Sequence, residues 1–466
     1  MLRGVRPVIK RTFMILGVTI VLVIVAVIAY YLWTIMQTPS MSTISHYDTL
    51  TTSTTTSPTT TTQTPSIPIV QGLENCSSPS IIYVYVSQEQ KENAEKFLET
   101  FIHEATRQGI NIQNIGGCMV NATAQGWRLR LYPSLLIKGN ISGLERYVED
   151  YVDGLGIIDY SISEAVARYL QINVTYTYHV KVYVVNGLSK WTKRNITLTP
   201  EFIKTLQSIA LAHVDSVERI DDNPPIKVDY RPTFLFYSKD DLTKGIIYME
   251  KIGENYYTIK KQYMLLLATE FFMTRFVEIY FDPKVPEEDI PVVGNREAPI
   301  ILYIFEDYWC PYCARFYKVN HELITELINN NTLQLHPLDF IVHRDVAELH
   351  ALTRCLYEYT GNSSIYFNIT LDLYYGFIDK GERPTIDTVL GIINKSMSNE
   401  MVNKIISCAN DKVNEILDET NSFHDKYGVR ATPTLLFWNR ETGKGMLIEG
   451  YIDEEEFKNI IGWLRK

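Results

Sequence analysis

The stretch APIILYIFEDYWCPYCARFYKVNHELITELINN, residues 298–330, decides the fold of the C-terminal part of the chain. Its apolar run from Ile300 to Phe305 predicts a buried strand. A short polar and aromatic turn follows, and apolar residues then recur at helical spacing, which predicts a helix that begins at the Cys-Pro-Tyr-Cys motif, residues 310–313. Cys310 is therefore expected at the N-cap and Pro311 at the first helical position, where the missing N–H of proline costs nothing.

This placement suits dithiol chemistry. The thiolate is the nucleophile in thiol–disulfide exchange, and free N–H groups at a helix start stabilise its negative charge. Such a site lowers a thiol pKa from about 8.5 into a range of roughly 3.5–7.5. Three residues on, Cys313 is close enough to attack a mixed disulfide and release the substrate. We therefore predict Cys310 as the exposed attacking thiol and Cys313 as the more buried resolving thiol.

Three other interpretations of the motif stay open. A zinc site would need a second ligand pair, but Cys355 and Cys408 are isolated and no His lies at ligand spacing with them, so neither metal nor cofactor is expected. The motif cysteines can also form a purely structural disulfide, or belong to a once-active site that now only binds. His343 and the other histidines are interpreted as surface or packed residues rather than catalysts.

The motif and one later stretch resemble a known family. FEDYWCPYCARF, followed after a long helical segment by YGVRATPTLLFWN (residues 427–439), is similar to the DsbA-like thioredoxin-fold disulfide oxidoreductases, and the likeness runs from Val293 to the C-terminus. It implies an α/β thioredoxin-like fold with an inserted helical subdomain. It also implies that Pro433 is a cis-proline facing the dithiol; alternatively, Pro433 merely starts an edge strand.

In that family arrangement the backbone of Thr432 is free to pair with an extended client segment, which adds as a short strand next to Cys310. Pro311 and Tyr312, inside the motif, are expected to contact the same segment. The family also carries a buried acid on the strand before the motif, and the matching position here is Ile304. Glu306 and Asp307 lie nearer the motif and either replace that acid or are solvated turn residues.

The remaining cysteines are expected to form structural bridges. Two helical patterns, residues 346–361 and 399–428, fit the inserted helices of the family, and each contains one cysteine, so we predict a bridge between Cys355 and Cys408. A loop of that size stabilises the fold by roughly 4 kcal/mol on the chain-entropy account. A second redox-active pair is the alternative. Cys76 and Cys118 flank the first strand–helix unit and are also predicted to form a bridge.

The N-terminal part carries an export signal. An uninterrupted apolar run, residues 13–33, predicts a transmembrane helix over residues 13–35 that contacts the lipid bilayer. Four basic residues precede it, so residues 1–12 are expected in the cytoplasm and the bulk of the chain outside, as a single-pass protein of the cell membrane. A cleaved signal peptide is the alternative. Residues 36–70, rich in Thr and Ser, predict an extended stalk.

The sequons agree with that topology. Nine N-x-S/T triplets without proline are spread over the part that follows the apolar run, although each alone is a weak signal. The acceptor residues are Asn75, Asn121, Asn140, Asn173, Asn195, Asn330, Asn362, Asn368 and Asn394. Together they favour a glycosylated surface outside the cytoplasm.

A weak internal repeat divides the rest. RPTFLFYSKDDLTKGIIYMEKIG, residues 231–253, matches TPTLLFWNRETGKGMLIEGYID from Thr432 without a gap, and a shorter version begins at Tyr132. A strand and a helix can be placed before each copy. We predict two degenerate thioredoxin-like domains, residues 71–170 and 171–285, and a catalytic domain, residues 286–466. Generic hairpin similarity is the alternative for the first two.

Function follows from the motif and the topology. The formal net charge of −10 without a basic stripe argues against nucleic acid as a partner. The predicted activity is disulfide formation in cysteine-containing secreted or surface proteins, and the family resemblance implies a membrane redox partner, DsbB-like or vitamin-K-epoxide-reductase-like. The alternatives are a reductase or isomerase of the DsbG type, which shares the Pro-Tyr dipeptide, and a non-catalytic surface binding protein.

Overall fold

The computed structural model describes residues 69–112, 115–285 and 290–466. The predicted cytoplasmic segment, the predicted transmembrane helix and the stalk up to residue 68 lie outside the described residues. Within the described ranges, no helix combines the length and the apolar character that crossing a membrane requires.

The C-terminal sheet is built around β16. This strand lies between parallel β17 and antiparallel β18, and all seven of its residues are buried. A strand covered on both faces has no solvent-facing side, which explains its continuous apolar run. The strand order is β11-β15-β19-β18-β16-β17. The strands are β11 (Tyr230–Arg231), β15 (Phe276–Ile279), β16 (Ile300–Glu306), β17 (Leu333–Asp339), β18 (Thr434–Asn439) and β19 (Lys444–Glu449).

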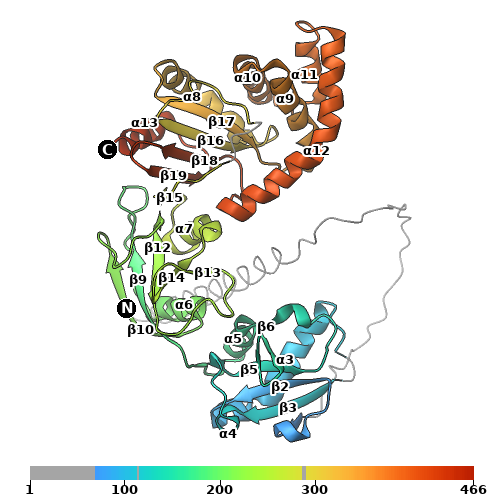
Figure 1. Ribbon diagram of the computed structural model, residues 1–466, viewed down its shortest axis with the longest axis vertical. Coiled ribbons are helices and arrows are strands. Elements are labelled where there is room, and N and C mark those ends of the chain that lie inside the picture. The colour runs from blue at the N-terminus through green and yellow to red at the C-terminus, as the bar shows by residue number, and fades with distance from the viewer. Residues whose placement is uncertain (1–68, 113–114, 286–289) are drawn as a thin grey trace, which may run out of the picture. The chain divides into compact units, whose positions relative to one another are not determined.

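Helices cover this sheet and extend beyond it. Four of them are inserted between β17 and β18, where α9 packs against α12 and α10 packs against α8 (Figure 1). This insertion agrees with the helical subdomain expected from the family resemblance. The helices are α8 (Pro311–Asn329), α9 (Ala347–Thr360), α10 (Ser363–Lys380), α11 (Ile386–Ile393), α12 (Asn399–Tyr427) and α13 (Glu454–Leu464).

The first unit has a sheet of its own, in the order β1-β3-β2-β5-β7-β6. Its inner strand β2 pairs in parallel with β3 and antiparallel with β5. The strands are β1 (Ile69–Gln71), β2 (Ser80–Tyr85), β3 (Gly116–Asn121), β5 (Ser134–Lys138), β6 (Val148–Val152) and β7 (Leu155–Ile158), with the main helices α3 (Ala94–Arg107) and α5 (Tyr160–Tyr169).

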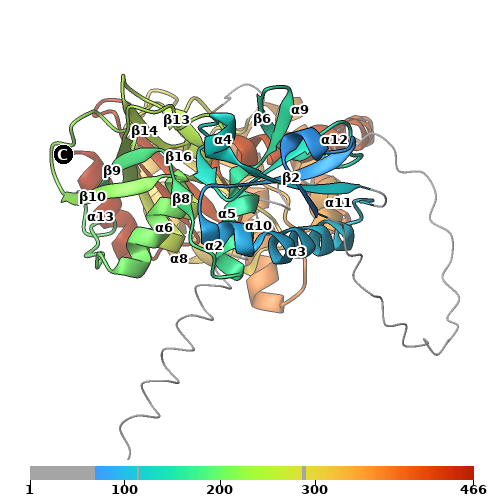
Figure 2. The ribbon, with the colours of Figure 1, turned by 90° about the horizontal axis from the view of Figure 1, so that it is seen from below.

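The second unit repeats this pattern in the order β10-β9-β12-β14-β13. Its inner strand β9 pairs in parallel with β10, beside it in Figure 2, and antiparallel with β12. The elements are β9 (His179–Val185), α6 (Pro200–Ala210), β10 (His213–Ile220), β12 (Thr233–Tyr237), β13 (Met249–Lys251), β14 (Tyr256–Ile259) and α7 (Met264–Phe272).

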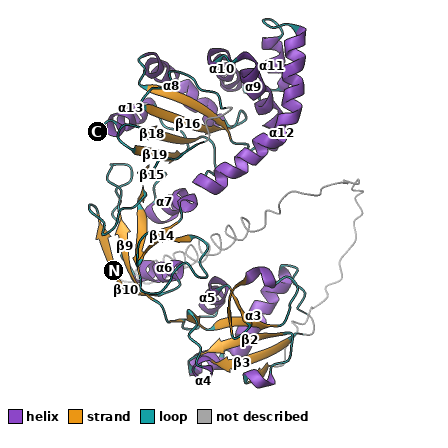
Figure 3. Cartoon of the chain, in the orientation of Figure 1, coloured by secondary structure: helices purple, strands orange, loops and turns teal. Residues whose placement is uncertain are grey.

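All three sheets therefore have the same central arrangement of three strands. Each has an inner strand between a parallel neighbour and an antiparallel strand that directly follows a proline, namely Pro133, Pro232 or Pro433. Figure 3 shows helices alongside each of these sheets.

Several segments cross the boundaries expected from the sequence. β11 and β15 precede residue 286, yet β15 pairs with β19 and β11 pairs with β15, so both belong to the C-terminal sheet. Thr175–Tyr176, expected in the second domain, pairs with Leu131–Tyr132 of the first. β1 begins at Ile69, inside the segment expected to be stalk, and pairs with β3. All are short strands whose partners lie far away in the chain, so local patterns carry no sign of them.

Candidate active site

β16 and α8 place the dithiol. Cys310 is the N-cap of α8 with extended backbone, φ −84° and ψ 115°, and Pro311 takes the first helical position. The N–H of Cys310 donates to the carbonyl of Asp307 at 2.9 Å, which fixes the turn between strand and helix. The N–H groups of Tyr312 and Cys313 stabilise the Cys310 thiolate. The local sequence signals therefore produce the expected helix start.

The sulfur of Cys310 is activated. Its pKa is lowered from 9.0 to about 6, chiefly because the thiol of Cys313 donates a hydrogen bond to it, with further help from the side chain of Thr432. In the protonated form, the thiol of Cys310 donates to the carbonyl of Thr432 at 3.2 Å. At neutral pH most of the sulfur is therefore thiolate, the form that attacks disulfides.

The two cysteines differ in environment. Cys313 is fully buried, and burial raises its pKa well above the ordinary value. Cys310 is only 5% exposed, so the expectation of an exposed attacking thiol is wrong in degree. The asymmetry still assigns attack to Cys310 and resolution to Cys313.

The predicted client-binding residues surround Cys310. The peptide bond between Thr432 and Pro433 is cis, and Thr432 faces the sulfur, as noted above. Pro311 and Tyr312 are exposed, and the Tyr312 ring stacks on Tyr451 at 6.0 Å between centroids. The structure thus brings the four predicted client-contacting residues to the neighbourhood of Cys310, with Pro311 and Tyr312 exposed, Thr432 half-buried and Pro433 buried.

The acidic residues before the motif are buried, so their interpretation as solvated turn residues is wrong. Glu306 is 1% exposed, accepts a hydrogen bond from the hydroxyl of Tyr317 at 2.6 Å, and has its pKa raised well above 4.5 by burial. Asp307 accepts from the backbone N–H groups of Val342 and His343. When it is ionised, Glu306 adds to the burial that raises the pKa of Cys313. Ile304, at the family position, is an apolar core residue.

Comparison with known proteins agrees with this geometry. Residues 287–462 match the family model described as Thioredoxin. The match covers the part of the chain that carries Cys310 and Cys313, and it agrees with the thioredoxin-like fold of that part. The match agrees with the prediction of a thiol–disulfide oxidoreductase. A search of curated proteins gave no match.

Solved structures similar to part of this chain include alpha-DsbA1 of Wolbachia pipientis, with 18% identity, a TM-score of 0.33, and coverage of 39% of this chain and 93% of that chain. Oxidised BdbD of Bacillus subtilis has 16% identity, a TM-score of 0.31, and coverage of 39% and 96%. BcfH of Salmonella enterica Typhimurium has 14% identity, a TM-score of 0.34, and coverage of 44% and 82%.

A buried polar network packs behind the Cys-Pro-Tyr-Cys motif, and no sequence pattern predicted it. His350 Nε2 accepts from the backbone N–H of Tyr308 at 3.1 Å, while its Nδ1 lies 2.6 Å from Asp339 Oδ1. Arg354 donates to the other oxygen of Asp339 at 2.7 Å. His350 and Arg354 lie one turn apart on α9. This i, i+4 spacing is the sequence feature that could have placed them side by side. The network holds the turn that leads into Cys310.

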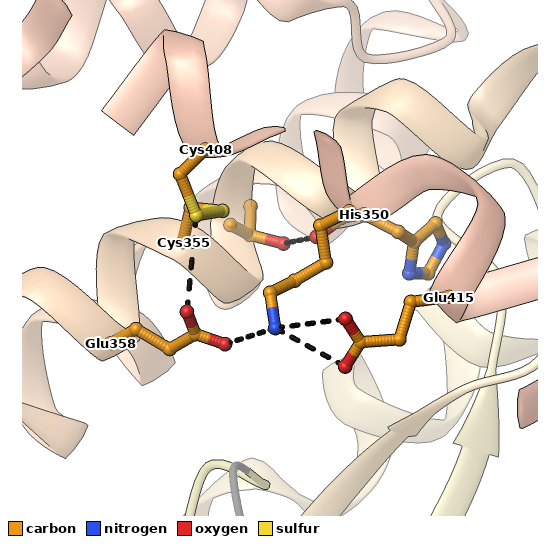
Figure 4. The surroundings of a disulfide bond; sticks show 7 residues. His350, Cys355, Glu358, Cys408 and Glu415 are labelled. Carbon is orange, nitrogen blue, oxygen red and sulfur yellow. Dashed lines mark hydrogen bonds and ion pairs between the residues drawn. A yellow bond between two sulfur atoms is a disulfide. The ribbon is translucent and has the colours of Figure 1, made fainter. Parts of the chain in front are cut away.

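Both pairs of remaining cysteines are bonded in the structure. Cys76 is joined to Cys118 and Cys355 to Cys408. Glu358 lies beside the second bridge, with Oε2 3.8 Å from Cys408 Sγ (Figure 4). These three side chains have the proximity of a metal site, but sulfurs that are bonded to each other offer no thiolate ligand.

His343, interpreted from the sequence as a surface or packed residue, is partly exposed and places Nδ1 3.2 Å from Asp307 Oδ1. The sequon asparagines lie at the surface of the described residues. All are exposed except Asn121, which is half-buried and caps a short helix.

Proposed function

We propose that this chain is a membrane-anchored oxidase that forms disulfide bonds in cysteine-containing secreted or surface proteins outside the cytoplasm. The observation that carries the proposal is the lowered pKa of Cys310 beside a fully buried Cys313. A stabilised thiolate favours the reduced enzyme, so the oxidised enzyme gives up its disulfide more readily.

The magnitude can be worked out. The folded pKa of Cys310 lies below its ordinary value, so the stabilisation of the reduced form is complete above the ordinary value and is lost as the pH falls through about 6. At pH 7 the shift from 9.0 to about 6 is worth about 1.4 kcal/mol, or about 30 mV for a two-electron couple. The thiolate therefore makes the reduction potential of the dithiol more oxidising. The strain and solvation of the disulfide set the remainder of that potential.

Disulfide formation in a client takes two exchange steps. A client thiolate attacks Cys310 in the Cys310–Cys313 disulfide, forming a mixed disulfide and releasing Cys313 as a thiolate that takes up a proton. A second client thiolate then attacks the client sulfur and releases Cys310. The client loses two electrons to the enzyme. A membrane partner, DsbB-like or vitamin-K-epoxide-reductase-like, accepts these electrons and restores the disulfide.

Several features support a location outside the cytoplasm. The apolar run over residues 13–35 serves as the anchor in the bilayer and residues 36–70 as the stalk. Two structural bridges within the described residues fit an oxidising compartment. Exposed sequon asparagines fit glycosylation there. The first two units, with the strand core of the third but no Cys-x-x-Cys motif, are degenerate thioredoxin-like domains in this proposal.

A reductase or isomerase of the DsbG type is the second candidate, because Pro311-Tyr312 and Thr432 resemble that branch. The reduction potential of the dithiol separates the two. A value near −120 mV fits an oxidase and a value near −270 mV a reductase. In growing cells, trapping of the thiols should show Cys310 and Cys313 oxidised; a reduced pair under aerobic growth would refute the oxidase. Loss of thiol exchange in Cys310→Ser excludes a purely binding role, whereas full activity of that variant would refute the enzyme.

A further inference from the structure

In the first unit, the chain pairs with itself at the place where a client would bind. The two residues before Pro133 form the short strand β4 (Leu131–Tyr132). This strand pairs antiparallel with β8 (Thr175–Tyr176), a segment that follows the unit in sequence. The corresponding backbone of the catalytic domain is that of Thr432, before Pro433, where an extended client segment is expected.

The second unit has the same arrangement. The two residues before Pro232 form β11, which pairs antiparallel with β15. β15 again follows its unit in sequence. Its other edge pairs with β19 of the catalytic sheet, so this segment is held from both sides (Figure 1).

The hydrogen bonds of the two pairings correspond. The N–H of Thr177 donates to the carbonyl of Arg130 at 2.9 Å, and the N–H of Tyr280 donates to the carbonyl of Asp229 at 2.8 Å. In each unit the acceptor is the third residue before the proline, and the donor directly follows the paired segment. Two unrelated segments therefore occupy equivalent positions with the same polarity.

The catalytic domain differs at this edge. Its third residue before the proline is Arg430, and among the described residues no backbone N–H donates to that carbonyl. Ala431 and Thr432 lie in no strand and are half-buried. The residues before the other two prolines are buried, at exposed fractions of 0% and 3% in β4 and of 1% and 7% in β11.

In the first unit, a side chain also bonds the carbonyl of the residue before the proline. Ser87 is the N-cap of α2 (Gln88–Glu92), and Gln90 stands three residues on, the spacing of Cys310 and Cys313. The side-chain amide of Gln90 donates to the carbonyl of Tyr132 at 3.1 Å. In the catalytic domain, the matching carbonyl accepts from the thiol of Cys310.

We propose that β8 and β15 fill the client-binding edges of the first and second units. These two edges then hold consecutive parts of the chain to one another, and the edge at residues 430–432 is the one left to bind clients. The inference rests on the proposed function only in taking the edge at residues 430–432 as the site where clients bind. An intramolecular segment acts at an effective concentration in the millimolar range, so a dilute client does not displace it.

The test uses the full-length chain and a short extended peptide with one photoreactive residue and one activated cysteine, together with its serine counterpart. Cross-links are mapped by mass spectrometry after illumination. We expect both peptides to label residues around 430–432 and to leave residues 130–132 and 229–231 at background. Equal labelling of all three edges in the wild-type chain would overturn the proposal.

Opening one edge provides the matched comparison. Thr177→Pro removes the N–H that bonds Arg130, while Thr177→Val keeps it and loses only the hydroxyl. Labelling at residues 130–132 should rise about fivefold in the proline variant over the valine variant, the factor expected for one lost backbone hydrogen bond. If the proline variant folds and its labelling does not increase, the edge at residues 130–132 does not bind client-like peptides.

Hydrogen exchange covers the case in which Thr177→Pro does not fold. In the wild-type chain, saturating peptide should leave the exchange rates of the Thr177 and Tyr280 amides unchanged, and faster exchange would mean that the peptide displaces β8 or β15 and would overturn the proposal. The activated cysteine reports thiol exchange at Cys310 separately. Loss of that reaction with normal labelling by the serine peptide would therefore refute the oxidoreductase and not the filled edges.

Discussion

Replacing Cys313 tests the origin of the low pKa of Cys310. The thiol of Cys313 is the largest cause of that lowering, through a hydrogen bond donated to the Cys310 sulfur. A hydrogen bond to a charged group contributes about 1.5–3 kcal/mol, and one pKa unit corresponds to about 1.4 kcal/mol. In Cys313→Ala, which has no donor, the pKa of Cys310 should rise by roughly one to two units. In Cys313→Ser the hydroxyl still donates, so the pKa should stay close to that of the wild type.

The assay is the rate of alkylation of Cys310 in the reduced chain as a function of pH. The buried Cys313 does not compete, because its own pKa is raised. Reactivity of the wild type should be half-maximal at a pH of about 6. The alanine variant should reach its midpoint at a distinctly higher pH, and the serine variant near the wild type. If the alanine and serine variants titrate together, the Cys313 donor is not what lowers the pKa.

Three further changes follow from the structure. When the reduced chain reacts with a disulfide-containing client, Glu306→Gln should slow the attack of Cys313 on the mixed disulfide on the order of 100-fold, because the carboxylate that accepts its proton is gone; rapid-mixing kinetics of client release check this, and an unchanged rate contradicts it. Cys355→Ser with Cys408→Ser should lower the free energy of unfolding by roughly 4 kcal/mol for a sequence separation of 53, with the dithiol still reactive, as denaturant titration and alkylation would show. Arg354→Leu should cost about 3–5 kcal/mol, because Asp339 is left as an unpaired buried charge, and a loss below about 1 kcal/mol would refute that account.

Local signals predicted the centre of the site. The strand before the motif, the helix start at Cys310 and the positions of Pro311 and Cys313 depend on residues close together in sequence, and the structure has each of them. Apolar periodicity and N-cap preferences act over this range, so a single sequence suffices.

Other parts depend on distant residues. Glu306 and Asp307 fit a solvated turn by their charge, yet both are buried: backbone N–H groups after β17 bond Asp307, and the hydroxyl of Tyr317 bonds one oxygen of Glu306. The two-residue strands β4 and β11 are too short to show any period, and their partners lie more than forty residues away. Only the packed structure brings these groups together.

The contrast between Gln90 and Cys310 explains how one edge can stay available while another is closed. The amide of Gln90 cannot lose a proton in this range of pH, so its hydrogen bond to the carbonyl of Tyr132 is permanent. The thiol of Cys310 has a pKa of about 6, and at neutral pH the sulfur is mostly deprotonated and donates nothing to the carbonyl of Thr432. In the oxidised enzyme that receives a client, Cys310 is bonded to Cys313 and likewise has no proton to donate, so the backbone acceptor beside it is available in both forms. A client N–H can then take that acceptor as the client cysteine approaches.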